Sequence, residues 1–136
     1  TDKLTYSAYD TYGPIFTPNE GEVLGVTQDG KPGLVVKKQS GWTSVYSACP
    51  AIPAAILRGI AANAGVNVAN YADGDVTFVG DKLTCIHTIE GGKRTISLPG
   101  KTGEVTELFT GRKFPIRDGK AVVEIQPRWT GLYFHP

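Results

Sequence analysis

The sequence lacks several features that would place it in a protein class at once. It contains no methionine and no apolar run approaching the ~18–20 residues that a membrane helix needs. Its 14 basic and 13 acidic side chains leave a formal net charge of +1, which gives no electrostatic reason to expect nucleic acid or an anionic membrane as a partner. Because methionine is missing even at position 1, we expect the chain to be an excised or processed piece.

Cysteine is also scarce. Cys49 and Cys85 are too few for a disulfide scaffold or for a zinc site of their own. Each lies among apolar neighbours, which favours two buried free thiols that act as small hydrophobic side chains. A disulfide between them is the alternative, and it requires a fold that brings their Cα atoms to about 5–6 Å.

What the 136 residues do contain is enough apolar material for a core and many turn residues. Hydrophobic residues make up 40%, and there are 17 glycines and 9 prolines. Such a chain is long enough for one compact domain, or for two small lobes that share a core.

The first third of the chain reads as an irregular segment followed by three strands. Residues 1–21 form an aromatic lead-in, interrupted by prolines, that we expect to pack onto something else. Strands are predicted at 22–28, 34–39 and 42–47, because apolar and polar residues alternate there between turns rich in Asp, Gly and Pro.

The periodicity then changes to that of a helix. Over residues 53–64, apolar side chains recur at spacings of three and four, with proline at the start and Gly65 just past the end. We expect the stripe of Ile56, Leu57 and Ile60 to dock on a sheet, so that Ile56→Ala would cost roughly 2–5 kcal/mol. A short strand at 66–69 is predicted to follow.

From residue 74 onward, strand and turn signals repeat at regular short intervals, which predicts an antiparallel β-sandwich or a small barrel, and we expect the sandwich. The fold class is therefore α+β, mostly β, with a hairpin-strand-helix-strand unit (22–73) followed by a β-sandwich unit (74–136), packed as one compact domain. The predicted strands are 76–79, 82–90, 93–98, 104–109, 113–116, 121–126 and 129–134. The predicted core residues are Val45, Ile56, Leu57, Ile60, Val76, Phe78, Ile86, Ile96, Val123 and Ile125.

The sequence offers few groups for catalysis. His87 alternates in phase with Leu83 and Cys85, so we expect it to point inward, and His135 lies next to the last residue, where we expect it to fray. No paired carboxylates, phosphate loop or metal-ligand spacing is present. We predict no catalytic residue, no metal and no cofactor in this chain.

Aromatic side chains are the remaining candidates for binding. Trp42 with Tyr46, and Trp129 with Tyr133, could stack against the apolar faces of sugar rings. Packing in the core or between domains is the alternative for each pair.

One segment carries a more specific pattern. Trp42–Ser47 and the following Ile52–Val66 resemble the "W-x-S-V-Y-S" strand and "L-P-x-x-L-L-R-x-I-A-x-x-A-G-V" helix at the end of the trimerisation domain of family 42 β-galactosidases. Residues 105–111 are similar to a strand of the small carboxy-terminal β-sandwiches of glycosidases. The likeness spans about residues 22–134, but the further strands and helices of a full trimerisation domain are missing here. The catalytic carboxylates of that family belong to a separate barrel and match no position in this chain.

The resemblance implies a noncatalytic carboxy-terminal accessory domain of a bacterial glycoside-hydrolase-like protein. Its expected partners are other domains of the same chain or further copies of it, with carbohydrate as an additional candidate, and a secreted or periplasmic location is implied. The alternatives are a carbohydrate-binding module that uses Trp42, Tyr46, Trp129 and Tyr133, and a small thiol enzyme that uses Cys49, Cys85 or His87.

Overall fold

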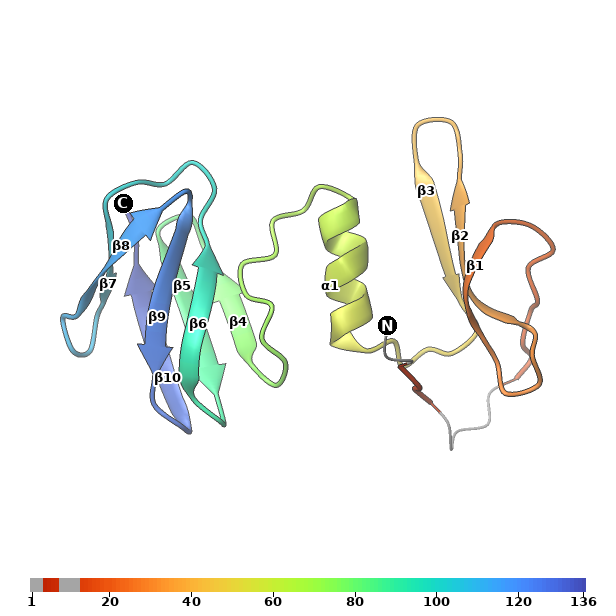
Figure 1. Ribbon diagram of the computed structural model, residues 1–136, viewed down its shortest axis with the longest axis horizontal. Coiled ribbons are helices and arrows are strands. Elements are labelled where there is room, and N and C mark those ends of the chain that lie inside the picture. Colours follow the sequence, from red (N-terminus) through yellow and green to blue (C-terminus); the bar gives the residue numbers. More distant parts are fainter. Residues whose placement is uncertain (1–3, 8–12) are drawn as a thin grey trace. The chain divides into compact units, whose positions relative to one another are not determined.

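The computed structural model describes residues 4–7 and 13–136. The chain is mostly β, as expected, with one helix, a three-stranded antiparallel sheet and a curled seven-stranded antiparallel sheet that forms a small β-sandwich-like fold (Figure 1). It divides into two compact units, Thr1–Pro53 and Ala54–Pro136. The division falls at Pro53 rather than near residue 73, because the backbone after the helix is hydrogen-bonded to the larger sheet: the amide of Ser97 donates to the carbonyl of Ala69 (2.8 Å).

The first unit is a meander of three strands, β1 (Glu22–Val26), β2 (Pro32–Lys38) and β3 (Thr43–Ser47). Neighbouring strands pair antiparallel, with β2 in the centre. The predicted turn between the first two strands forms at Asp29-Gly30, where Gly30 adopts the left-handed conformation (φ 80°) that favours glycine. All three predicted strands of this unit are therefore present.

The lead-in packs on this same sheet. The hydroxyl of Tyr46 donates to the carbonyl of Phe16, and Lys37 pairs with Glu20, so residues 16–20 lie over one face. Tyr6 lies within hydrogen-bond distance of Ser47 (3.4 Å), whose side chain belongs to the opposite face. The described parts of the lead-in contain no helix or strand, as expected; residues 1–3 and 8–12 lie outside the described residues.

The second unit begins with helix α1 (Ala54–Asn63) and continues with seven strands in the spatial order β4-β5-β10-β7-β8-β9-β6. Every neighbouring pair is antiparallel. The predicted strand at 66–69 does not form, because this segment lies against the edge of β6 as irregular chain. The strands are β4 (Val76–Val79), β5 (Leu83–Thr88), β6 (Gly92–Ser97), β7 (Glu104–Glu107), β8 (Lys113–Arg117), β9 (Lys120–Ile125) and β10 (Trp129–Phe134).

Helix α1 ends as the sequence predicts, but none of its side chains belongs to a buried core. Gly65 adopts φ 80°, its amide donates to Ala62, and the amide of Val66 donates to Ala61, which is the Schellman arrangement of a helix end. No residue of α1 is buried, and Leu57 is 49% exposed. The prediction that the stripe of Ile56, Leu57 and Ile60 belongs to the core is therefore wrong. Accordingly, Ile56→Ala should cost less than a core substitution.

The core of the second unit lies inside the curl of the large sheet. Four predicted core residues, Ile86, Ile96, Val123 and Ile125, are buried there, with 3% exposure at most. Of the other predicted core residues, Val45 is half-buried in the first unit, whereas Val76 and Phe78 are exposed on the outer face of β4. The complete cluster is Ile86, Ile96, Leu98, Val105, Ala121, Val123, Ile125 and Tyr133.

A polar network of side chains joins the two edge strands of the curled sheet, β4 and β6. Arg94 of β6 forms an ion pair with Asp75, immediately before β4, through contacts of 2.6 and 3.1 Å. Their side chains are only 12% and 1% exposed. The amide group of Asn70 donates to Asp75 (2.9 Å) and to Thr77 of β4 (3.1 Å). We call this set of Asn70, Asp75, Thr77 and Arg94 the seam network.

Burial alone would raise the pKa of Asp75, but hydrogen bonds from Arg94 and Asn70 outweigh it and lower the pKa of the carboxyl. Because the folded state lowers this pKa, the carboxylate stabilises the fold above the ordinary Asp value of about 4. That contribution is lost as the pH falls through the lowered pKa.

We predict that Arg94→Gln lowers the free energy of unfolding by about 3–5 kcal/mol, because it leaves the Asp75 carboxylate buried without its cation. Urea unfolding of the variant checks this prediction. The matched control is Arg58→Gln, which removes the ion pair with Asp73, a carboxylate whose side chain is 80% exposed. We expect that control to cost about 1 kcal/mol at most. Equal effects of the two changes would contradict the structural role of the seam network.

Gly131 of β10 lies under the ring of Tyr133, and a Cβ added at position 131 would overlap that ring. We therefore predict that Gly131→Ala destabilises the protein by about 1–3 kcal/mol through overpacking. In contrast, nothing lies within 4 Å of a Cβ at Gly59 in α1. Gly59→Ala should be neutral or stabilise by up to about 1 kcal/mol. Thermal unfolding of both variants measures the difference, and a Gly131→Ala protein as stable as the parent would refute the packing argument.

Candidate functional site

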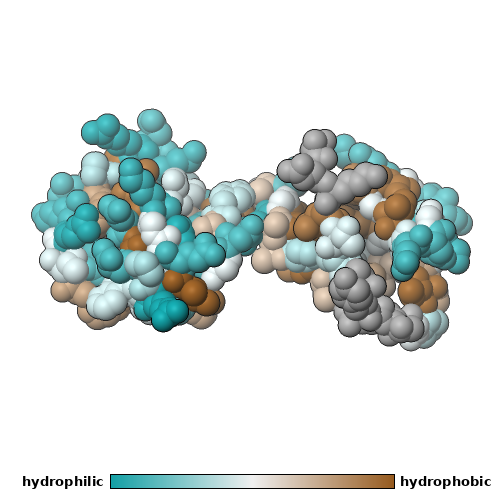
Figure 2. Space-filling view, turned by 60° about the horizontal axis from the view of Figure 1, so that its bottom comes forward, coloured by the Kyte–Doolittle hydropathy of each residue, from teal (hydrophilic) through white to brown (hydrophobic). Residues whose placement is uncertain are grey.

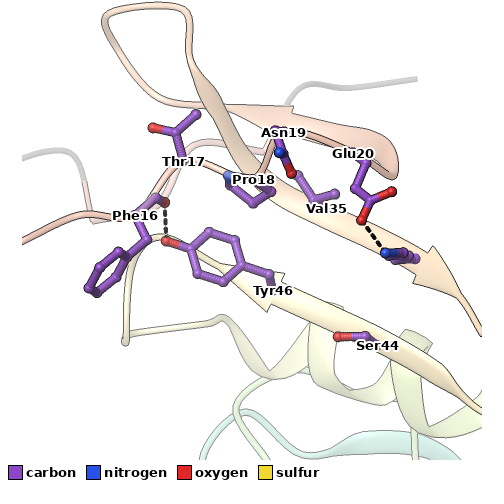
Figure 3. A pocket seen from close by; sticks show the side chains of 9 residues that line it. Phe16, Thr17, Pro18, Asn19, Glu20, Val35, Ser44 and Tyr46 are labelled. Carbon is purple, nitrogen blue, oxygen red and sulfur yellow. Dashed lines mark hydrogen bonds and ion pairs between the residues drawn. The ribbon is translucent and has the colours of Figure 1, made fainter.

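The first predicted aromatic pair, Trp42 and Tyr46, does not form a common platform. Trp42 is 61% exposed and precedes β3, where its carbonyl accepts a hydrogen bond from Gln39 (2.8 Å). Tyr46 is half-buried and lines a hollow of about 290 Å³ together with residues 16–20 and three side chains of β2 and β3, as Figure 3 shows. Its hydroxyl points to the carbonyl of Phe16. Tyr46 therefore holds the lead-in, and Trp42 is outside this hollow.

The second pair is divided between surface and core. Trp129 is 45% exposed and meets the ring of Phe109 edge to face, with centroids 6.2 Å apart and planes at 82°. Phe109, which is 61% exposed, was not a predicted site residue. Its position after β7 is brought next to β10 only by the sheet order, so sequence spacing carries no signal for this contact.

Tyr133 belongs to the core, which contradicts the prediction that its ring stacks against a sugar. It is 1% exposed, and its ring packs at 66° against Phe114. Burial, with the charge of Glu107 as a second cause, raises the pKa of Tyr133 to about 12. A side chain so enclosed has no face free for a sugar ring.

Both predictions for the histidines are wrong: His87 does not point inward, and His135 is not frayed. His87 is exposed on the outer face of β5, where its Nδ1 lies 2.9 Å from the hydroxyl of Thr130. The inward side chains of β5 are instead Thr84, Ile86 and Thr88. His135 is 2% exposed and contacts Thr84 through Nε2 (3.2 Å); burial, the largest cause, lowers its pKa. The Nδ1 atom of His135 has no hydrogen-bond partner among the described residues.

The two buried carboxylates, those of Asp75 and Glu107, accept hydrogen bonds that stabilise the fold. Asp75 belongs to the seam network. Glu107 is 6% exposed and accepts hydrogen bonds from the amide and the hydroxyl of Thr110 (2.7 and 2.6 Å). Burial would raise the pKa of Glu107, but these hydrogen bonds outweigh it and lower the pKa. Both groups therefore stabilise turns or edges rather than face a cavity as an acid/base pair.

The two cysteines are free thiols, and each is half-buried. Cys49 belongs to the first unit and Cys85 to the second, on the same outer face of β5 as His87. Within residues 4–7 and 13–136, no group of three or more His, Cys, Asp or Glu side chains could hold a metal ion.

The outer face of β4, β5 and β10 is apolar and open. Register places Phe78, Cys85 and Leu132 in one row across the three strands, with Leu83 opposite Phe134 beside them. Phe78 is 68% exposed, Phe134 41% and Leu83 39%. Apolar residues reach the surface in both units (Figure 2). We call this set of Val76, Phe78, Leu83, Cys85, Leu132 and Phe134 the outer apolar face.

A larger groove of about 730 Å³ lies elsewhere on the second unit. It is lined by the end of α1 and the segment that follows it, by strand β6 with Pro99 beyond its end, and by Lys120 of β9. Tyr71, Lys93 and Lys120 all border this groove and are exposed, and none of them was a predicted site residue. Their signal in the sequence is weak, because they lie in three segments that only the curled sheet brings together.

No family model, no curated protein and no solved structure matches this chain. No helix among the described residues has the length and apolar character to cross a membrane. The outer apolar face and the groove are the two surface features of the described residues that bear on function.

We predict that Tyr133→Ala costs about 3–5 kcal/mol of stability, as for other buried aromatic residues. Trp42→Ala should cost less than about 1 kcal/mol, because Trp42 is 61% exposed, and Trp129→Ala, at a position that is 45% exposed, should cost less than Tyr133→Ala. Urea unfolding followed by circular dichroism compares the three variants. If Trp129→Ala proved as costly as Tyr133→Ala, Trp129 would be a packing residue and not available to stack against a sugar.

Proposed function

We propose that this chain is a noncatalytic accessory domain of a glycoside-hydrolase-like protein, and that it packs against another domain of its polypeptide or against a second copy. The observation that carries the proposal is the outer apolar face. Six apolar side chains gather on the outward side of three adjacent strands. On the solvent-facing side of an antiparallel sheet, polar side chains normally occupy these positions.

The chemistry of this face suits burial against protein. Its strand positions carry no charged side chain. The polar pair on it, His87 and Thr130, is joined by a hydrogen bond at Nδ1 of His87, so that Nε2 of the same ring is the side-chain nitrogen that a covering partner would have to pair. A face of this kind favours association through apolar contact, as at interfaces between domains.

The small core of the first unit supports the same role. In its three-stranded sheet, the buried apolar side chains are Leu34 and Val35, whereas Val23, Leu24 and Val26 of β1 are exposed. A sheet of three strands needs a hydrophobic face packed against something to be stable. Contact with a further folded body would provide the missing burial.

The glycoside-hydrolase part of the proposal rests on the resemblance of residues 42–66. The strand and the helix that this resemblance implies are both present, as β3 and α1. The assignment as noncatalytic is supported by the structural use of Asp75 and Glu107, the two buried carboxylates.

Phe78→Asp should abolish association through the outer apolar face while changing the stability of the chain itself by no more than about 0.5 kcal/mol, because Phe78 is largely exposed. The control is Val122→Asp, at a 56% exposed position on β9 outside this face. Light scattering measures self-association of each variant.

Alkylation of Cys85 provides a second readout, with Cys49 as the internal reference. If the face is covered within a longer polypeptide or a dimer, labelling of Cys85 should slow there relative to the chain alone, and Phe78→Asp should restore it. A chain that stays monomeric, with Cys85 labelled at the same rate in the longer polypeptide, would overturn the proposed function.

A further inference from the structure

We propose that the groove between β6 and the segment after α1 binds an acidic oligosaccharide, a chain of sugar rings that carries carboxylate groups. This inference concerns residues that are not part of the outer apolar face, so it does not rest on the proposed function. It assigns a ligand class to a concave surface whose volume, about 730 Å³, lies in the range of small-molecule sites.

The charge of the groove favours an anion. Its border includes Lys93, Arg94 and Lys120 and no acidic residue. Asp75 neutralises Arg94, whereas neither Lys93 nor Lys120 forms an ion pair with a carboxylate of the described residues. Glu124 is opposite Lys93 in the pairing of β6 with β9 but does not line the groove. Two exposed ammonium groups are therefore free to contact carboxylates.

The spacing of these cations favours an extended ligand over a single small anion. Lys120 pairs with Ser97, four residues along β6 from Lys93. Four residues of strand span about 13 Å, so the two lysines mark opposite ends of the groove. A ligand that reaches both needs more than one anionic group along its length.

The groove also carries the polar and aromatic groups that sugars use. Tyr71, which is 59% exposed, offers a ring face. Ser97 directs its backbone groups away from β9, since its amide donates to Ala69 and its carbonyl accepts from Asn67 (3.1 Å). In an antiparallel strand the backbone groups of residues two apart point to the same side, so the amide and carbonyl of Thr95 also point away from β9. The amide and carbonyl of Thr95 can exchange hydrogen bonds with sugar hydroxyls, whereas those of Ser97 are used by Ala69 and Asn67.

The walls of the groove are already fixed by hydrogen bonds within the protein, so a ligand would not have to order them. Two hydrogen bonds fix the side chain of Asn67 to Ser97. The amide group of Asn67 donates to the carbonyl of Ser97 (3.1 Å), and the hydroxyl of Ser97 donates to the side-chain oxygen of Asn67 (2.7 Å). Asn70 and Arg94 are fixed in the seam network. Preformed walls reduce the ordering cost of binding.

The test is calorimetric titration of the whole chain with a trigalacturonate, beside a neutral galactotriose of the same ring number. Saturable binding of the acidic sugar is expected, at least about tenfold tighter than that of the neutral one, and weakened by salt. The double variant Lys93→Gln/Lys120→Gln should lose about tenfold or more in affinity, and Tyr71→Ala should weaken binding as well. The matched control, Lys38→Gln/Lys82→Gln, removes the same charge at exposed lysines outside the groove and should bind as the parent does.

Several outcomes would overturn the proposal. These are absence of saturable binding by trigalacturonate, equal binding of galactotriose, and equal loss of affinity in the control double variant. Inorganic phosphate and a polyglutamate peptide are titrated in parallel. If either bound the groove as tightly as the acidic sugar, the ligand class would be wrong. Self-association through the outer apolar face is scored separately by light scattering, so failure of one proposal leaves the other measurable.

Discussion

A seven-stranded antiparallel sheet has two free edges, and in this protein one ion pair joins them. Asp75 and Arg94 bring the start of β4 to β6, and Asn70 ties the incoming chain to the same place. Closing the curl in this way encloses Ile86, Ile96, Val105 and Val123 completely. It also covers part of an edge that would otherwise expose unpaired backbone groups. The core, the path of the segment after α1 and the groove on β6 all depend on this contact.

The curl gives the large sheet an unusual division of side chains. On β5, the inward positions include Thr84 and Thr88, while Leu83 and Cys85 face outward. The inward threonines are tolerated because Thr84 contacts His135, and Thr88 accepts hydrogen bonds from Arg94 and the amide of Gly91. Polar groups thus occupy part of the interior, whereas apolar groups occupy part of the surface. This inversion is the physical basis for the proposal that the outer apolar face packs against protein.

The two proposed surfaces use different strands of the same sheet. The outer apolar face belongs to β4, β5 and β10, and the groove is bordered by β6 and the start of β9. Apolar contact suits a permanent neighbour, whereas a polar groove with free cations suits a ligand that exchanges with solvent. A domain built in this way could stay attached to its protein while presenting the groove to an acidic sugar chain.

Local chemistry in the sequence determined most of the elements. Alternating side chains between Gly- and Asp-rich turns specified all ten strands, and Pro53 with Gly65 specified the helix, because turn and cap residues act on neighbouring backbone alone. Tertiary structure decided which face of each strand points inward and which distant residues come together. Because a strand with mixed side chains has two possible inward faces, only the curl of the sheet settled that His87 points out, that Tyr133 and His135 are buried, and that Phe78 is exposed. Likewise, only long-range pairing placed Asp75 beside Arg94 and gathered Tyr71, Lys93 and Lys120 around one groove.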